Sequence, residues 1–234
     1  MIKIRPSAAR GHANHGWLDT HFTFSFANYY DPKHMGFRDL RVINEDWVSA
    51  KQGFGAHPHN DMEIITYIVE GELSHRDSTG TEATIRQNDV QRMSAGTGVV
   101  HSEYNNSEKP VHLLQIWIMP EASDLQPSYE DRTFKREEKR NRLRLIASRD
   151  GRTGSTRINQ HVSVYASLLD SGRSLDLDLP AGRYAWVQLV SGELEVNETR
   201  LSKGDGAAIS DETKLTLTSV GSDGAAEFLL FDLA

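Results

Sequence analysis

The sequence predicts an all-β protein built from two jelly-roll barrels in tandem. Most of its 234 residues fall in short runs where apolar residues cluster or alternate with polar ones, and few segments show helical periodicity. Turn residues separate these runs at short intervals, which is typical of a β-barrel or jelly roll. A weak internal repeat indicates that the barrel occurs twice.

The expected strands are short and spread over the whole chain. Apolar or alternating runs mark them at residues 23–26, 40–44, 64–69, 112–118, 142–145, 185–189 and 215–218. Turn-forming residues gather between them at 78–80, 88–89, 171–172, 180–182, 203–206 and 221–224. Glycine, proline, asparagine, aspartate and serine favour these positions because they tolerate or pre-set the backbone angles of a chain reversal.

The repeat rests on two similar strand endings. Residues 69–73 read Val-Glu-Gly-Glu-Leu, and residues 190–194 read Val-Ser-Gly-Glu-Leu. Apolar periodicity fades in the polar stretch 121–140, so we place the seam there. The expected domains are residues 1–128 and 129–234.

The composition excludes several classes of protein. Cysteine is absent, so neither disulfide bonds nor thiolate metal ligands are available. The formal net charge is −7, and the basic stretch 135–149 also contains acids, which favours a solvated strand face over nucleic-acid binding. No apolar stretch approaches the ~20 residues that span a bilayer, and the N-terminus lacks a signal core. We therefore expect a cytoplasmic protein without nucleic-acid or membrane partners.

Two short pairs carry the strongest chemical signal. His57 and His59 are two residues apart, and so are His101 and Glu103. Side chains two apart on a strand share a face, so two neighbouring strands would aim three imidazoles and one carboxylate at a common point. Such a set suits a divalent transition metal. A lone His-x-His is a weak signal, but glycine-rich turns precede both pairs and strengthen the interpretation.

The second half does not repeat this pattern. The same spacing places Asp178, Pro180, Leu217 and Ser219 at the four ligand positions. We therefore expect the domain at 129–234 to carry no metal site and to act as a support or a lid.

The remaining histidines have simpler interpretations. In the N-terminal segment, His12, His15 and His21 are expected to form local hydrogen bonds that hold it in place. The others are expected to be surface or strand residues: His34, His75, His112 and His161.

Longer motifs around the two pairs resemble those of the pirin family, whose members are two-domain cupins. Gly53-x3-His57-x-His59-x3-Glu63-x7-Gly71 resembles the first cupin motif, and Gly98-x2-His101-x3-Asn105 resembles the end of the second. The segments 10–18 and 94–98 are pirin-like rather than generally cupin-like. The resemblance implies a bicupin, with a metal-binding N-terminal cupin domain and a second cupin domain.

The resemblance also implies a ligand set of His57, His59, His101 and Glu103. Many other cupins use the carboxylate of the first motif, here Glu63, and its even spacing from His59 leaves it open on strand parity. We favour Glu103, because the pirin pattern places the ligand in His-x-Glu. Glu63 would then lie behind the ligands or be paired elsewhere, and Asn105 is also placed behind them.

The function implied is that of bacterial pirin-like quercetin 2,3-dioxygenases. Such an enzyme cleaves flavonols with dioxygen, so the expected partners are a small enolisable aromatic substrate and dioxygen. Metal coordination lowers the pKa of a bound hydroxyl, and Glu103 would be the catalytic base. Iron(II) is the first choice of metal, with nickel, copper, cobalt and zinc left open. A monomer is expected.

A second hypothesis is a non-enzymatic regulator that carries the same metal and binds a protein partner. An enzyme needs an open pocket above the metal, whereas a regulator needs a protein-binding surface. The sequence shows no tail, basic patch or amphipathic helix suited to a partner, so this hypothesis ranks second.

Overall fold

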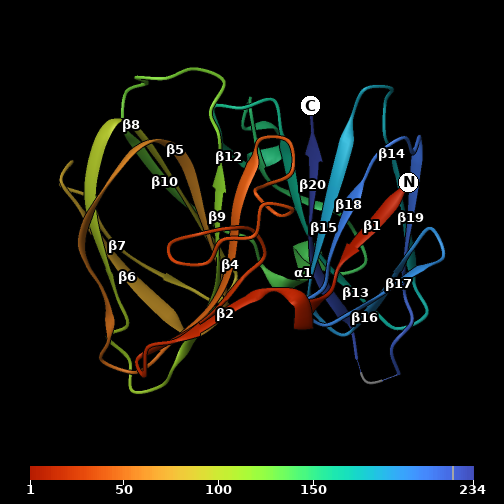
Figure 1. Ribbon diagram of the computed structural model, residues 1–234, viewed down its shortest axis with the longest axis horizontal. Coiled ribbons are helices and arrows are strands. Elements are labelled where there is room, and N and C mark those ends of the chain that lie inside the picture. The colour runs from red at the N-terminus through yellow and green to blue at the C-terminus, as the bar shows by residue number, and fades with distance from the viewer. Residues whose placement is uncertain (223) are drawn as a thin grey trace. The chain divides into compact units, whose positions relative to one another are not determined.

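The computed structural model describes residues 1–222 and 224–234 and confirms the predicted all-β fold of two jelly-roll barrels (Figure 1). One compact unit, here the first barrel, contains residues 11–133 and 156–160. The other, the second barrel, contains residues 1–10, 134–155 and 161–234. The predicted turn at 221–224 includes residue 223, which lies outside the described residues.

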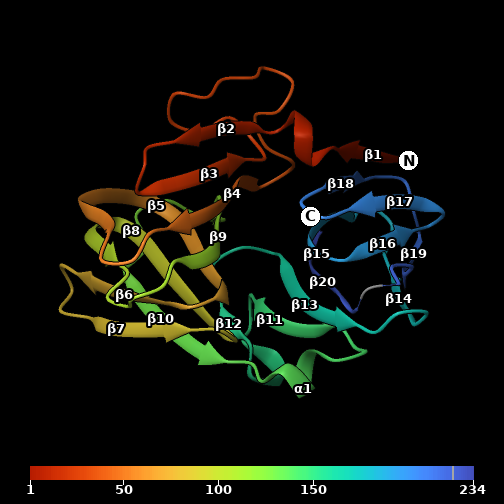
Figure 2. The ribbon, with the colours of Figure 1, turned by 90° about the horizontal axis from the view of Figure 1, so that it is seen from below.

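Ten strands belong to the first barrel. They are β2 (Gly11–Asn14), β3 (Leu18–Phe22), β4 (Leu40–Val48), β5 (Gly53–Glu70), β6 (Glu72–Asp77), β7 (Glu82–Arg86), β8 (Asp89–Tyr104), β9 (Val111–Ile118), β10 (Ser128–Thr133) and β12 (Thr156–Arg157). Their main sheet has the order β2-β3-β4-β9-β5-β8-β6-β7, with β10 paired to β8. Figure 2 shows this sheet curling from the β2 edge to the β6–β7 hairpin.

The core of the first barrel follows from the apolar runs of its central strands. In β5 every residue from 63 to 68 is buried, so both faces of this stretch are covered, and β8 and β9 pair with it along its two edges. Aliphatic side chains from several strands meet there in one cluster: Leu18, Val48, Ile68, Leu73, Ile85, Val111 and Leu113. The outer half of β5, residues 53–62, is partly exposed and is therefore free to carry polar side chains.

The second barrel is formed by two sheets around one core. Its elements are β1 (Ile2–Arg5), α1 (Arg136–Lys139), β11 (Arg144–Ser148), β13 (Ser163–Leu169), β14 (Ser174–Asp178), β15 (Tyr184–Ser191), β16 (Glu193–Val196), β17 (Thr199–Ser202), β18 (Gly206–Ile209), β19 (Lys214–Ser219) and β20 (Ala226–Leu233), with 3-10 turns at Ser7–Ala9 and Arg152–Gly154. One sheet runs β1-β18-β15-β20-β13-β11 and the other β14-β19-β16-β17. Alternate residues of both, such as Val187, Phe228, Leu194 and Leu217, fill the space between them.

Most predicted strands lie inside observed ones, but the strand expected at 23–26 is wrong. β3 ends at Phe22, and the chain then leaves the sheet. Thr23 to Ser25 are buried outside any strand, and hydrogen bonds run from Thr23 N to Ile43 O and from Ser25 N to His34 O. Their apolar alternation therefore reflects burial under a loop rather than a place in a sheet.

The polar stretch 121–140, where the seam between the domains was expected, contains more regular secondary structure than its sequence predicts. The stretch 121–140 contains β10 and α1, and all six residues of β10 pair with β8. Residues 1–10 belong to the second barrel, because β1 pairs with β18. The boundary proposed between residues 128 and 129 stays a prediction.

No helix in the part of the chain that the structure describes combines the length and hydrophobicity that crossing a membrane requires.

The β5–β8 pair depends on a glycine at its outer end. Gly53 pairs with Tyr104, and a methyl group at Gly53 would lie 2.6 Å from the Cα of Tyr104 and closer still to the backbone oxygen of Glu103. Gly55, two residues later, has no atom within 4 Å of such a methyl group.

Alanine substitutions at these two glycines should differ in their effect on stability. Gly53→Ala should destabilise the protein by about 1–3 kcal/mol, because the two strand backbones must separate. Gly55→Ala should change the stability by no more than about 0.5 kcal/mol. Urea unfolding of both variants measures the difference, and equal stability of the two would contradict the role given to the close approach at Gly53.

Candidate metal centre

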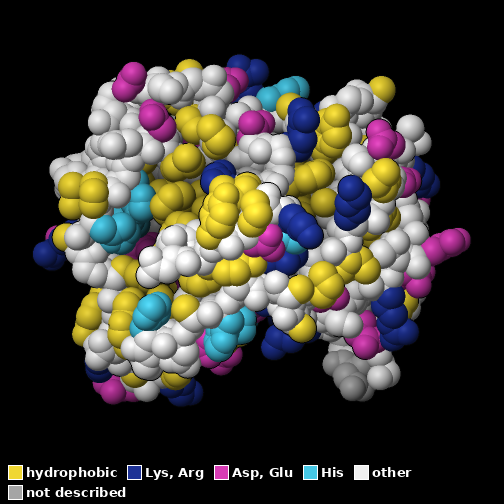
Figure 3. Space-filling view, in the orientation of Figure 1, with side chains coloured by type: hydrophobic (Ala, Val, Ile, Leu, Met, Phe, Trp, Pro, Cys, Tyr) yellow, Lys and Arg dark blue, Asp and Glu magenta, His cyan; other side chains and the backbone are white. Residues whose placement is uncertain are grey.

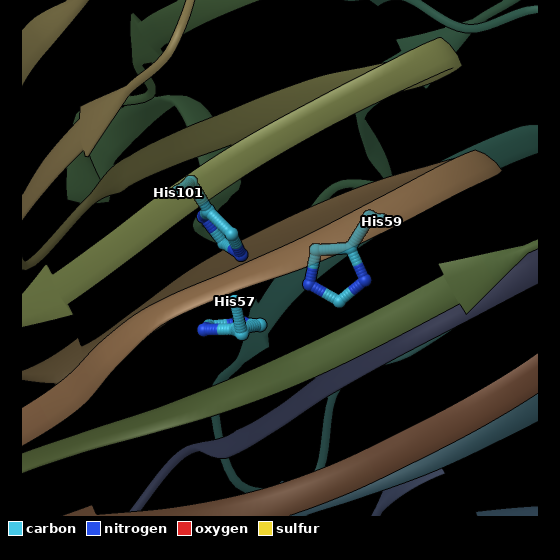
Figure 4. A group of neighbouring side chains, drawn as sticks. All are labelled: His57, His59 and His101. Atoms are coloured by element: carbon cyan, nitrogen blue, oxygen red, sulfur yellow. The ribbon is translucent and has the colours of Figure 1, made fainter.

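Three histidines converge at the outer half of the β5–β8 pair (Figure 4). His57 on β5 lies directly opposite His101 on β8, and His59 is two residues further along β5. The ring centroid of His57 is 4.4 Å from that of His101 and 4.8 Å from that of His59. One nitrogen of each ring lies within 4.8 Å of the others. The sequence-predicted cluster of three imidazoles is therefore present.

Burial favours the neutral form of His59 and His101, and metal binding requires neutral imidazoles. Burial, with the neighbouring His57, lowers the pKa of His59 to about 4. Burial, with the nearby His57, His59 and His75, lowers the pKa of His101 to about 3. At neutral pH both rings therefore present a lone pair rather than a second proton.

Hydrogen bonding orients the ring of His57. Its Nδ1 donates to the carbonyl oxygen of Gly55 at 2.7 Å. The proton of a neutral imidazole is thereby placed on Nδ1, which leaves the lone pair of Nε2 available to a ligand.

A chain of three side chains orients His101. Asp77 Oδ2 lies 2.9 Å from His75 Nε2, and His75 Nδ1 lies 3.4 Å from His101 Nδ1. Because a carboxylate only accepts, a neutral His75 carries its proton on Nε2, and its Nδ1 is then the acceptor. His101 must then donate through Nδ1, which leaves Nε2 unprotonated. Among the described residues, this buried Nε2 has no hydrogen-bond partner.

The charge of Asp77 is secured at the far end of this chain. Burial alone would raise the pKa of Asp77, but hydrogen bonds from His75, Thr79 and Thr81 hold it below its ordinary value. The carboxylate therefore stays ionised and fixes the direction of the hydrogen bonds that lead to His101.

Glu103 is also buried, but the structure groups it with different neighbours. It lies opposite His75 on β6, and one oxygen of Glu103 is within 4.8 Å of a nitrogen of His75 and of His101. Glu103 Oε2 accepts a hydrogen bond of 3.1 Å from Gln115 Nε2, while Oε1 has no hydrogen-bond partner in the part of the chain that the structure describes. Its inclusion with all three histidines in one ligand set stays a prediction.

A second buried carboxylate affects Glu103. Burial, with the nearby Asp46, raises the pKa of Glu103 to about 7, against hydrogen bonds from Gln115 and Gln91. Burial likewise raises the pKa of Asp46 to about 7, against a hydrogen bond from Thr20. Two carboxyl groups in one barrel interior thus both titrate near neutral pH.

Glu63 is directed elsewhere, although its spacing from His59 is even. Val99 pairs with His59, so the two side chains lie on the same face of the sheet, and Val99 also packs against Ile64 on that face. His59 and Ile64 are five residues apart, and residues at an odd spacing lie on opposite faces of a regular strand. The alternation of faces therefore shifts by one residue between them. The irregular backbone at Asp61, with φ of +60°, lies in this interval. The side chain of Glu63 instead accepts hydrogen bonds from Ser94 Oγ at 2.6 Å and Asn159 Nδ2 at 3.0 Å.

Asn105 holds a loop rather than a histidine. Its Nδ2 donates to the carbonyl oxygens of Val48, Ser49 and Lys109, and its Oδ1 accepts from Ser107. Among the described residues, these bonds do not reach the three histidines or Glu103. Its place behind the ligands stays a prediction.

Sequence reasoning missed the contribution of β6 and β9. His75 lies in strand β6, which fits the expectation of a surface or strand residue, but it is also only 2% exposed and contacts His101. A signal was present, because His75 and Asp77 have the same two-residue spacing as the recognised pairs. Gln115 gave no such signal, since a single glutamine in an apolar strand carries no chemical pattern.

The donor set fits a divalent transition metal. The buried Nε2 of His101 and Oε1 of Glu103 both lack partners, and buried polar atoms without partners are rare. Neutral imidazole nitrogens with a carboxylate oxygen suit the borderline metals from iron to zinc. Within the described residues, the three groups of side chains able to hold a metal all lie in the first barrel.

A jelly-roll barrel with histidines on two paired strands defines a cupin, and comparison with known proteins narrows the class. The pirin model matches residues 3–118, and a model described as the quercetinase C-terminal cupin domain matches residues 145–233. The chain belongs to the pirin family.

Its relatives match along the full length. The quercetin 2,3-dioxygenase of Escherichia coli strain K12 is 48% identical over 100% of this chain and 99% of its own. A pirin-like protein of Caulobacter vibrioides is 37% identical over 100% of both chains. The bacterial pirin YhhW of Escherichia coli, solved in complex with nickel(II), has a TM-score of 0.94 at 46% identity, covering 100% of this chain and 99% of that one.

The hydrogen-bonded chain to His101 predicts an effect on metal affinity. His75→Asn or Asp77→Asn should weaken nickel binding about 10–100-fold, because His101 is no longer held with Nε2 unprotonated. Calorimetric titration of the metal-free, untagged protein measures this. His34→Asn is the matched control, since it breaks a His–Asp contact of 2.8 Å to Asp31 away from the centre. Unchanged affinity in both test variants would rule out the orienting role.

Replacing Asp46 by asparagine should increase the stability of the protein in a pH-dependent way. The fold raises its pKa from 3.8 to about 7, so wild-type protein loses stability as the pH rises through this interval. Asp46→Asn removes that loss and should stabilise the protein by roughly 1–3 kcal/mol at about pH 8, with the gain fading towards about pH 4. Urea unfolding across this range measures it, with the exposed Asp131→Asn as control. A gain independent of pH would show that titration of Asp46 is not its cause.

Proposed function

We propose that this chain is a metal-dependent dioxygenase that cleaves flavonols such as quercetin with dioxygen. The observation that carries the proposal is the cluster of three histidines beside the buried carboxyl group of Glu103, one oxygen of which lies within 4.8 Å of a nitrogen of His101. The full-length relative at 48% identity, named quercetin 2,3-dioxygenase, supports the same reaction class.

The proposed ligands are His57, His59, His101 and Glu103. Nickel in the Escherichia coli pirin supports a divalent metal, and histidine–carboxylate sets are typical of non-haem iron(II) oxygenases. Iron(II) is therefore the proposed metal, and nickel, copper, cobalt or zinc are compatible with the same atoms. His57 and His59 are only partly buried, which gives a small molecule access to the cluster.

The side chains around the cluster suit an acidic aromatic hydroxyl. A bound metal would supply Lewis-acid chemistry, which lowers the pKa of a hydroxyl that it coordinates. Glu103 is the proposed base and would accept the substrate proton on the carboxylate oxygen that does not hold the metal. Trp117 lies edge-on to His59 at 4.9 Å and to Phe26 at 5.2 Å, so aromatic rings flank one side for a flat substrate.

The reaction is tested with the iron-loaded protein, quercetin and no added reductant. Because the chain would use the substrate as the source of electrons, we expect quercetin and dioxygen to disappear in equal amounts. Glu103→Gln should lower kcat at least about 100-fold, as loss of a general base does. Glu63→Gln, which alters a carboxylate bonded to Ser94 and Asn159, should have a smaller effect. Quercetin absorbance and an oxygen electrode measure both.

His57→Ala separates catalysis from autoxidation. It should lose stoichiometric metal and the bleaching of quercetin together. Bleaching at the wild-type rate in this variant, or in the presence of a chelator, would overturn the proposal and favour a metal-bearing regulator.

A further inference from the structure

A second group of side chains able to hold a metal ion lies on the N-terminal hairpin, apart from the centre described above. His12 on β2 is directly opposite His21 on β3 in the antiparallel register. Asp19 precedes His21 by two residues on β3, and alternate residues of a strand share a face. Two imidazoles and one carboxylate therefore project from the same side of this hairpin.

The three side chains are close enough to bind one metal ion together. His12 Nε2 lies 2.7 Å from Asp19 Oδ1, and His21 Nε2 lies 3.9 Å from the same oxygen. The two imidazole rings are stacked, with centroids 4.5 Å apart and planes inclined by 12°. All three candidate ligand atoms lie within 4.8 Å of one another.

The hairpin holds these side chains in place before any ligand binds. Every residue of β3 pairs with β4, so Asp19 and His21 are fixed to the main sheet. The ring of His21 meets Trp47 edge-on at 5.7 Å, and Trp47 stacks on His112 at 4.2 Å. An arrangement held in advance loses less conformational freedom when a metal binds.

The group is open to solvent. The side chain of His12 is 52% exposed, that of Asp19 42% and that of His21 30%. Figure 3 shows exposed histidine side chains, in cyan, over the part of this face where Figure 1 draws β2. An ion from solution therefore reaches the ligand atoms without a change in the fold.

We propose that His12, Asp19 and His21 form a second site for a divalent transition metal, of which zinc is the test case. Two imidazole nitrogens and a carboxylate oxygen are ligands that zinc accepts, and water would complete its coordination. The site shares no residue with the histidines of β5 and β8. The ion would join the edge strand β2 to β3, because its ligands come from both strands.

Zinc stoichiometry tests the proposal in the untagged, metal-free full chain. Equilibrium dialysis against zinc, followed by elemental analysis, should show one more ion in wild type than in His21→Phe. Phenylalanine keeps a ring between His12 and Trp47 but removes the ligand. Asp19→Asn should weaken the binding of the second ion more than about 10-fold. Even the loss of a residue that only hydrogen-bonds to a metal ligand has an effect of that size on metal affinity.

Two further measurements identify the site. His15→Ala removes an exposed histidine from the same hairpin outside the group and should keep the extra ion. Zinc should slow hydrogen exchange of the amides of β2 in wild type and not in His21→Phe. Equal zinc content in wild type and His21→Phe, or loss of the extra ion in His15→Ala, would overturn the proposal. His57→Ala should keep the extra ion, so this result is independent of the proposed enzyme activity.

Discussion

The pairing of β5 with β8 is the constraint on which the metal centre depends. Its register sets His57 opposite His101, and the same two strands bring His59 and Glu103 to that end of the barrel. The inner half of β5 is buried on both faces, and β8 and β9 pair with it along its two edges. Packing of these apolar residues fixes the β5–β8 register, and the same register aligns the polar residues of the outer half. A slip of one residue would turn the histidines to the other face and expose the core residues together, so packing and chemistry select the same register.

Burial then determines the charge of the side chains that the register collects. The same desolvation that keeps His59 and His101 neutral raises the pKa values of Glu103 and Asp46 towards 7. Neutral imidazoles can lie this close together because they offer lone pairs to a metal without repelling one another as positive charges would. The ionised Asp77, at the end of the hydrogen-bonded chain through His75, gives that cluster its orientation.

The first barrel thus presents histidines in two physically different settings. At β5 and β8 hydrogen bonds from behind orient His57 and His101, and burial keeps His59 and His101 neutral. At β2 and β3 they are exposed, stacked and paired with one carboxylate. The first setting suits a metal that must react with a bound molecule in a partly dry site. The second suits a metal that joins two strands at the sheet edge.

Local patterns in the sequence by themselves determined the all-β fold, the family motifs and the placing of the pairs His57/His59 and His101/Glu103 on neighbouring strands, because strand periodicity places residues two apart on one face. That rule holds only while a strand is regular. The tertiary structure decided that Glu63 turns away, since the backbone at Asp61 breaks the alternation, and that residues 23–26 leave the sheet. It also brought in His75 and Gln115 from other strands, and their role depends on cross-strand register and burial. Neither quantity is local in the chain, so both become visible only when the barrel is closed.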